Sequence, residues 1–190
     1  MLVGYFILMP GKTFWWQMFF SFTSQPTVHS AVVTTLFLER GGMFHHSQYL
    51  GEIDSILVNE ETYMTMAEPR NWHLLLPNIE RDRIERWLVD NVSDTMLLSR
   101  AAFGANDAVF VSPLDSFDFL TADGQRRYFE RFGPVPQLTF SQTGFSEDST
   151  RAFMHMVYEE LSMSAYGFVF VLKQVPEGWV LESWKPTWHR

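Results

Sequence analysis

Cysteine is missing from this chain of 190 residues. Its absence excludes disulfide bonds, thiolate catalysis, and zinc or iron–sulfur sites built on cysteine ligands. It does not fix the redox compartment, because proteins of the cytoplasm and of the periplasm can both do without cysteine. We favour the cytoplasm and leave the periplasm and the cell envelope open.

Charge is sparse and mostly negative. Charged residues make up 19% of the chain, below the roughly 25% that is usual in soluble domains, and the formal net charge is -8. An acidic chain repels phosphate backbones, so we expect no nucleic-acid partner. The densest basic segment, residues 81–86, alternates arginines with acidic residues, which is typical of a solvated helix face.

Motifs that hold common cofactors are absent as well. The chain has no phosphate-binding glycine loop, no G-x-S-x-G elbow and no H-E-x-x-H metal motif. His45 and His46 are adjacent, and adjacent strand residues point to opposite sides of the strand. We therefore predict no cofactor and no metal, and interpret the two histidines as part of an exposed polar loop.

A phenylalanine-rich segment contains Asp115, Asp118 and Asp123. Calcium loops place oxygen ligands at alternate positions, with a glycine and a distal glutamate, and that spacing fails here. Capping of a following helix by Asp123 or Thr121 is the better interpretation.

The first 26 residues form an apolar N-terminal segment that ends at Gln25-Pro26. Neither of its two apolar runs reaches the roughly 18–20 residues that a membrane-spanning helix requires. Three alternatives stay open: an export signal or membrane anchor, a strand or short helix packed on the domain, and a misplaced start codon. Any membrane association would involve residues 1–25, and residues 27–190 are predicted to form a single domain.

Apolar and aromatic residues are plentiful, at 46% and 16% of the chain. In the last fifty residues, four short apolar runs (138–146, 151–158, 167–173 and 178–184) are separated by turn-forming residues, which is typical of an antiparallel meander. Within the second run the residues alternate. Ala152, Met154, Met156 and Tyr158 share one face, and Phe153, His155, Val157 and Glu159 share the other.

Two helices are predicted upstream of the meander. Asn78 follows Pro77 and can cap a helix over 78–91, and a second helix over 121–132 is ended by Gly133-Pro134. β-branched residues in 27–38 and the apolar run in 53–58 favour further strands, and residues 108–111 are predicted to form a loop or a strand. This order predicts an α+β fold in which about two helices pack on one face of a curved antiparallel sheet.

The C-terminal part resembles a bacterial family of uncharacterised proteins. The matching pieces are Tyr128–Pro134, Ser141-Gln-Thr-Gly144-Phe145, Ala152, Gly167–Leu172, Gly178-Trp179 and Trp188. The resemblance covers residues 120–190, or 75–190 at most. It implies a β-meander fold and no activity, because none is assigned to the family. The chain departs from the pattern twice: no residue separates Gly178 from Trp179, and residues 159–166 lack the cysteine pair found in many members.

Candidate ligand-binding residues are His155, Glu159 and Trp188. His155 and Glu159 would lie about 13 Å apart on one sheet face, where a pocket could fit between them. The competing interpretation is structural: a buried, hydrogen-bonded histidine, a polar strand end, and a core or sheet-edge tryptophan beside Trp179 and Trp184. We predict a domain that binds a small ligand or a protein partner and assign no catalytic residue. The alternative is an enzyme with a sheet-lined cavity, like the nuclear-transport-factor cone, using His155 or His73 as a general base.

Overall fold

The computed structural model describes residues 27–47, 50–63, 71–104, 106–113, 121–160 and 164–189. The apolar N-terminal segment, Asp115 and Asp118 lie outside these ranges, so the predictions made for them are not addressed by the structure. Within the described ranges, no helix combines the length and the apolar character needed to cross a lipid bilayer.

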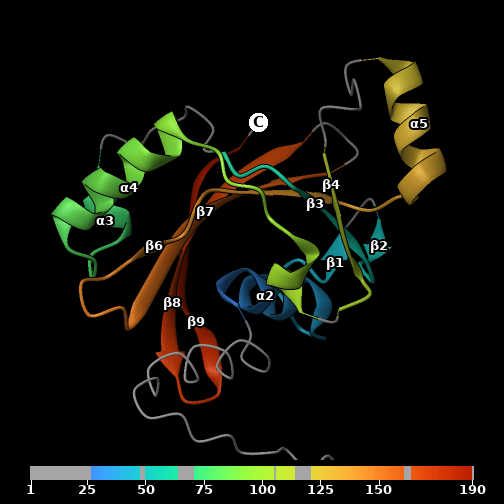
Figure 1. The fold of residues 1–190 in the computed structure, drawn as a ribbon. Helices are drawn as coiled ribbons and strands as arrows, with labels where there is room; N and C mark the ends of the chain where they lie inside the picture. The colour runs from blue at the N-terminus through green and yellow to red at the C-terminus, as the bar shows by residue number, and fades with distance from the viewer. Residues whose placement is uncertain are drawn as a thin grey trace, which may run out of the picture.

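Seven strands build one curved, unclosed sheet in the order β4-β3-β5-β7-β8-β9, with β6 paired to β7 (Figure 1). The strands are β3 (Ile56–Asn59), β4 (Val109–Ser112), β5 (Gln137–Phe140), β6 (Gly144–Phe145), β7 (Arg151–Glu159), β8 (Ala165–Val175) and β9 (Gly178–His189). A separate two-stranded ribbon joins β1 (His46–Ser47) and β2 (Gly51–Glu52). Most pairings are antiparallel, but β3 is parallel to both β4 and β5.

The predicted meander is confirmed. β5 pairs with β7, β7 with β8, and β8 with β9, all antiparallel. A turn at 146–149 leads from β6 to β7, and a turn at 176–177 leads from β8 to β9. The predicted alternation along β7 also holds. Met154 and Met156 belong to one buried cluster, whereas Phe153 belongs to another on the opposite face of the sheet.

The strand predicted over 27–38 is wrong. The structure has helix α2 (Val28–Val33), which continues into a π-helical turn, η1 (Thr34–Leu38). Thr27 caps α2, because its side-chain oxygen accepts a hydrogen bond from the Ser30 N–H at 3.1 Å. Buried residues recur with helical spacing, at Val28, Ala31, Val32 and Leu36. Burial of this stripe outweighs the weak preference of valine and threonine for strands.

Both predicted helices are present. Helix α4 (Arg81–Ser93) begins three residues later than expected, so Asn78 lies in the preceding turn and does not cap the helix. Helix α5 (Ala122–Phe132) is capped by Thr121, whose hydroxyl oxygen accepts a hydrogen bond from the Gly124 N–H. At the end of α5, Gly133 has φ +77°, a value that favours glycine.

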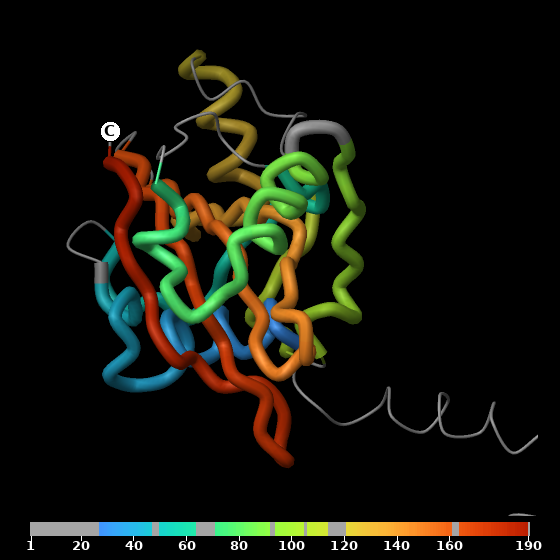
Figure 2. Tube along the Cα trace, turned by 90° about the vertical axis from the view of Figure 1, so that its left-hand side faces the viewer, coloured from blue at the N-terminus to red at the C-terminus, as the bar shows by residue number. Residues whose placement is uncertain are grey.

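The helices cover both faces of the sheet, not one. Helix α2 lies inside the curve of the sheet, where it packs in the main core beside Phe140 and Phe170 (Figure 1). On the other face, α4 and the short helix α3 (Trp72–Leu75) pack on Phe153 and Val169 (Figure 2). The one-face prediction fails because α2 was taken for a strand.

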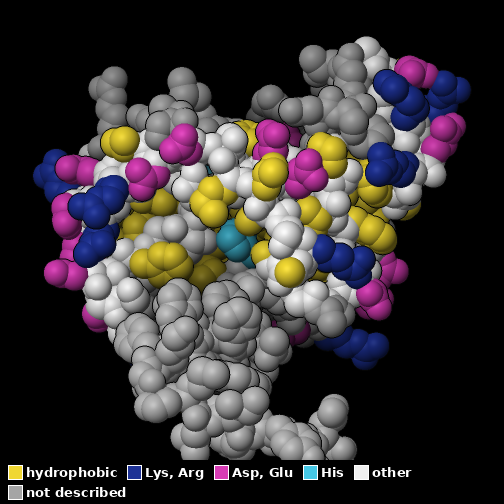
Figure 3. Space-filling view, in the orientation of Figure 1, with side chains coloured by type: hydrophobic (Ala, Val, Ile, Leu, Met, Phe, Trp, Pro, Cys, Tyr) yellow, Lys and Arg dark blue, Asp and Glu magenta, His cyan; other side chains and the backbone are white. Residues whose placement is uncertain are grey.

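Helix α5 packs near β3, away from the end of the sheet formed by β8 and β9. Tyr128 packs there with Leu57 of β3 and donates a hydrogen bond to the carbonyl oxygen of Val135 at 2.8 Å. Charged side chains gather over the outer surfaces of α4 and α5, and hydrophobic side chains are more frequent on the face between them (Figure 3). The helices therefore present polar outer surfaces and use their apolar faces to cover the sheet.

Candidate functional site

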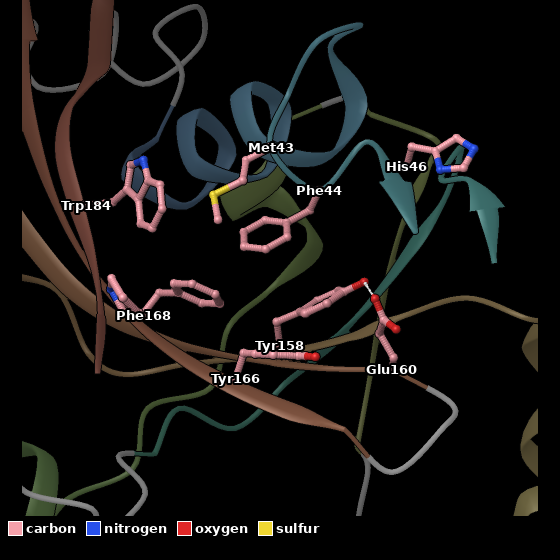
Figure 4. Close-up of a pocket in the computed structure, with 9 residues that line it drawn as sticks. Met43, Phe44, His46, Tyr158, Glu160, Tyr166, Phe168 and Trp184 are labelled. Atoms are coloured by element: carbon pink, nitrogen blue, oxygen red, sulfur yellow. Dashed lines mark hydrogen bonds between the residues drawn. The ribbon is translucent and has the colours of Figure 1, made fainter. Parts of the chain in front are cut away.

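A pocket of about 490 Å³ opens between the chain that follows η1 and the strands β7, β8 and β9 (Figure 4). Its volume falls within the range of roughly 300–1,000 Å³ that is common for small-molecule sites. Most of its lining is aromatic. The lining residues are Met43, Phe44, His46, Tyr158, Glu160, Tyr166, Phe168, Trp184 and Pro186.

One wall depends on a tight reversal of the chain after η1. A Cβ atom on Gly42 would lie 2.6 Å from the Thr35 carbonyl oxygen, so only glycine fits this approach. Two residues on, the Phe44 N–H donates to the carbonyl oxygen of Leu36 at 2.8 Å. The reversal turns Met43 and Phe44 toward the sheet, where they cover one side of the pocket.

The opposite wall is the sheet itself. Tyr158 of β7 pairs with Tyr166 of β8, and Phe168 pairs with Pro186 of β9. Register shifts in the β8–β9 ladder fall between Gly167 and Phe168 and between Val171 and Leu172, so Trp184 and Pro186 lie between two irregularities. In this register Trp184 reaches the same face as Phe168, with 5.9 Å between their ring centroids.

The aromatic rings form one connected set. Phe44 stacks on Tyr158 with ring centroids 5.0 Å apart and meets Phe168 edge-to-face, also at 5.0 Å. Phe37 packs behind both Phe44 and Tyr158. These contacts fix the inner rings, and such pairs add about 0.5–1.5 kcal/mol each beyond the area that they bury. Trp184 differs, because 38% of it stays exposed at the mouth.

One carboxylate belongs to this aromatic lining. The Tyr158 hydroxyl donates a hydrogen bond to Glu160 Oε1 at 2.6 Å (Figure 4). Among the described residues that line the pocket, His46 is the one basic side chain, and lysine and arginine are absent. Lys185 follows Trp184 in sequence but donates to the carbonyl oxygen of Leu74, within α3 on the other face of the sheet.

His155, a predicted ligand residue, is buried beneath α3. It is 2% exposed, and its ring meets Trp72 edge-to-face at 5.9 Å. Its Nε2 atom lies 3.1 Å from the Thr187 hydroxyl, and its backbone N–H donates to Ser141 Oγ at 2.9 Å. Burial lowers the pKa of His155 from 6.5 to about 4, so the ring is neutral at pH 7. Nδ1 is buried and has no hydrogen-bond partner.

Trp188 and Glu159, the other two predicted residues, are not among the residues that line the aromatic pocket. Trp188 pairs with Gly167, and a Cβ atom on that glycine would lie 2.7 Å from Trp188 Cε2, so the absent side chain makes room for the indole. Trp188 lines a neighbouring pocket of about 350 Å³ that shares Tyr166, Phe168 and Pro186 with the larger one. Glu159 ends β7 opposite Gln137 and is partly buried. His155 contacts Thr187, the neighbour of Trp188 in the chain, and the role of His155 and Trp188 in binding stays a prediction.

The remaining histidines are dispersed. His73 is exposed on α3, and His45 lies between the Phe37 carbonyl oxygen, 3.0 Å from Nδ1, and Glu52 Oε1, 3.2 Å from Nε2. His29 of α2 packs edge-to-face on Phe140 at 5.2 Å. Across the part of the chain that the structure describes, no three histidine, aspartate or glutamate side chains are grouped so as to hold a metal ion.

Comparison of the chain with family models, curated proteins and solved structures finds no match. The resemblance of the C-terminal part to an uncharacterised bacterial family therefore stays an expectation.

Part of the pocket could have been found in the sequence. Tyr158 falls on a face named by the alternation of β7, and Tyr166 and Phe168 follow the same period of two in β8. Trp184 could be noticed in the sequence because it is one of three tryptophans close together near the C-terminus. Met43 and Phe44 carried no such signal, because they lie in a short loop whose position against the sheet depends on the unpredicted α2 and η1.

Proposed function

We propose that this protein is a binding domain for a small molecule with a flat or compact apolar body, which it takes into the aromatic pocket. One observation carries the proposal: rings from the loop after η1 and from three successive strands meet around a space of about 490 Å³. Small-molecule sites are usually concave and mostly apolar, with a few polar groups that fix orientation. Here Glu160 and the Tyr158 hydroxyl are such groups.

The enzymatic alternative has less support. A general base should have a pKa near the working pH and should reach the substrate through a hydrogen bond. Burial holds the pKa of His155 at about 4, and its Nε2 atom is already paired with Thr187. His73 is exposed on α3, and neither histidine lines the aromatic pocket. Binding without turnover is therefore the function that we propose.

Indole is a suitable first probe, because it is small, neutral and flat. We expect it to bind with a dissociation constant of about 1 mM or tighter, measured by calorimetry or by saturation-transfer NMR. Trp184→Leu should weaken binding about ten-fold by removing a ring face at the mouth, and Phe44→Leu should weaken it similarly from the opposite wall. Trp184 is partly exposed, so its replacement leaves the core in place.

Val180→Ala provides the matched control, because Val180 lies on the same strand, is 45% exposed and does not line the pocket. Its affinity for indole should equal that of the parent protein. Unchanged indole affinity in both the Trp184 and Phe44 variants would place binding elsewhere. Failure of the parent protein to bind indole at about 1 mM would contradict the proposal itself.

A further inference from the structure

We propose that the pocket selects an organic cation whose charge is spread over methyl groups, such as a quaternary trimethylammonium group. This inference rests on the proposed function and adds the chemical class of the ligand. It follows from the kinds of atoms that surround the pocket.

The electrostatic potential of the aromatic rings in the pocket favours a cation. The face of an aromatic ring carries partial negative charge and attracts a cation placed above it, and tryptophan is the strongest of the aromatic residues in this respect. Phe44, Tyr158, Tyr166, Phe168 and Trp184 all line the pocket. Trp184 is 38% exposed at the mouth, so its indole is available to an incoming ligand.

The formal charges at the pocket also favour a cation. Glu160 supplies a carboxylate that the Tyr158 hydroxyl holds in place at 2.6 Å, and this hydrogen bond leaves the negative charge of the carboxylate intact. Lys185, which follows Trp184 directly, extends to Leu74 on the far side of the sheet. The net charge of -8 adds a long-range attraction for cations and disfavours anions.

The lining of the pocket favours a quaternary ammonium over a primary one. A primary ammonium has three N–H donors that lose their water on entering a pocket and then need acceptors. The described lining is mainly aromatic, with Glu160 as its one carboxylate. Because a quaternary ammonium has no N–H donor, it loses little by entering this environment and gains the attraction of the rings.

Choline and 3,3-dimethyl-1-butanol form a matched pair of probes, since the alcohol has a carbon atom in place of the charged nitrogen. Calorimetric titration of the full chain should show choline binding about ten-fold tighter than the alcohol. A short peptide with a trimethylated lysine carries the same head group. Tighter binding of that peptide would indicate a protein-borne ligand, and tighter binding of choline a free metabolite; either result supports the proposed class.

Substitutions at two pocket residues, with one control outside the pocket, test the origin of the preference. Glu160→Gln should reduce the ratio of choline to alcohol affinity by several-fold, whereas Glu177→Gln, the same charge change in the exposed turn before β9, should leave the ratio unchanged. Trp184→Phe should retain much of the preference and Trp184→Leu should lose most of it. The urea midpoint of each variant verifies that it is folded.

Equal affinity for choline and the alcohol would overturn the inference, as would indole binding without any choline binding. Both of these results leave the proposed function standing. Failure of the parent protein to bind indole would overturn the proposed function, and the inference that rests on it would fall with it.

Discussion

Replacing Trp87 with alanine should lower the free energy of unfolding by about 3–5 kcal/mol, the range for large aromatic residues removed from a core. Trp87 is 3% exposed and lies at the centre of the contact between α4 and the sheet. Its ring meets Trp72 at 5.3 Å and Phe153 at 5.2 Å, both edge-to-face. Its Nε1–H donates to the carbonyl oxygen of Gln142 at 2.6 Å, so the substitution also removes a hydrogen bond.

Urea denaturation followed by circular dichroism measures this loss. Trp87→Phe, which retains a ring but not the N–H donor, should cost less than Trp87→Ala. Arg86→Ala provides the control on the same helix, because Arg86 is exposed, and it should change the free energy of unfolding by less than about 0.5 kcal/mol. Similar midpoints for Trp87→Ala and Arg86→Ala would show that α4 is not anchored through this ring.

Acidification should destabilise the protein through His155. The folded-state pKa is lowered by burial to about 4, whereas the unfolded chain has the ordinary value of 6.5. Below pH 6.5 the unfolded chain therefore binds a proton that the folded protein does not, and stability falls until the pH approaches 4. Between about pH 7 and pH 4.5 this single residue should remove about 2–3 kcal/mol from the free energy of unfolding.

His29 contributes in the same direction, because burial also lowers its pKa to about 4. Its Nε2 atom is buried without a partner, although the residue as a whole is only partly buried, so we expect a smaller effect from it. Urea titrations across this pH range should give a shallower pH dependence for His155→Gln than for the parent protein. The exposed His73 offers a control: His73→Gln should retain the full dependence. Parallel curves for the parent and His155→Gln would mean that the imidazole is protonated in the folded state.

The sequence predicted the elements that are marked by local signals. Proline, glycine and a regular apolar spacing bound the β7–β9 meander and α5, and both lie where they were expected. For 27–38, two local signals disagreed, since valine and threonine favour a strand whereas the spacing of the buried residues favours a helix. Burial of one helical face in the folded protein favours the helix, and this burial could not be predicted from residue preferences alone.

The pocket was harder to predict than the sheet. Period two correctly placed Tyr158 and His155 on opposite faces of the sheet, but His155 and Glu159 were chosen from the face of Phe153, which α3 and α4 cover. Nothing local indicated that Trp72 would bury His155. The contact between Phe44 and Tyr158 joins segments far apart in the chain and depends on the reversal at Gly42, so neither propensity nor spacing could give it.

The central claim is that the aromatic pocket is the ligand site, and intermolecular nuclear Overhauser effects from bound indole test it most directly. We predict contacts from the indole protons to the rings of Trp184 and Tyr166 and to the methyl group of Met43, which lie around the pocket (Figure 4). Contacts confined to the α4 side of the sheet, for example to Leu88, would contradict the account.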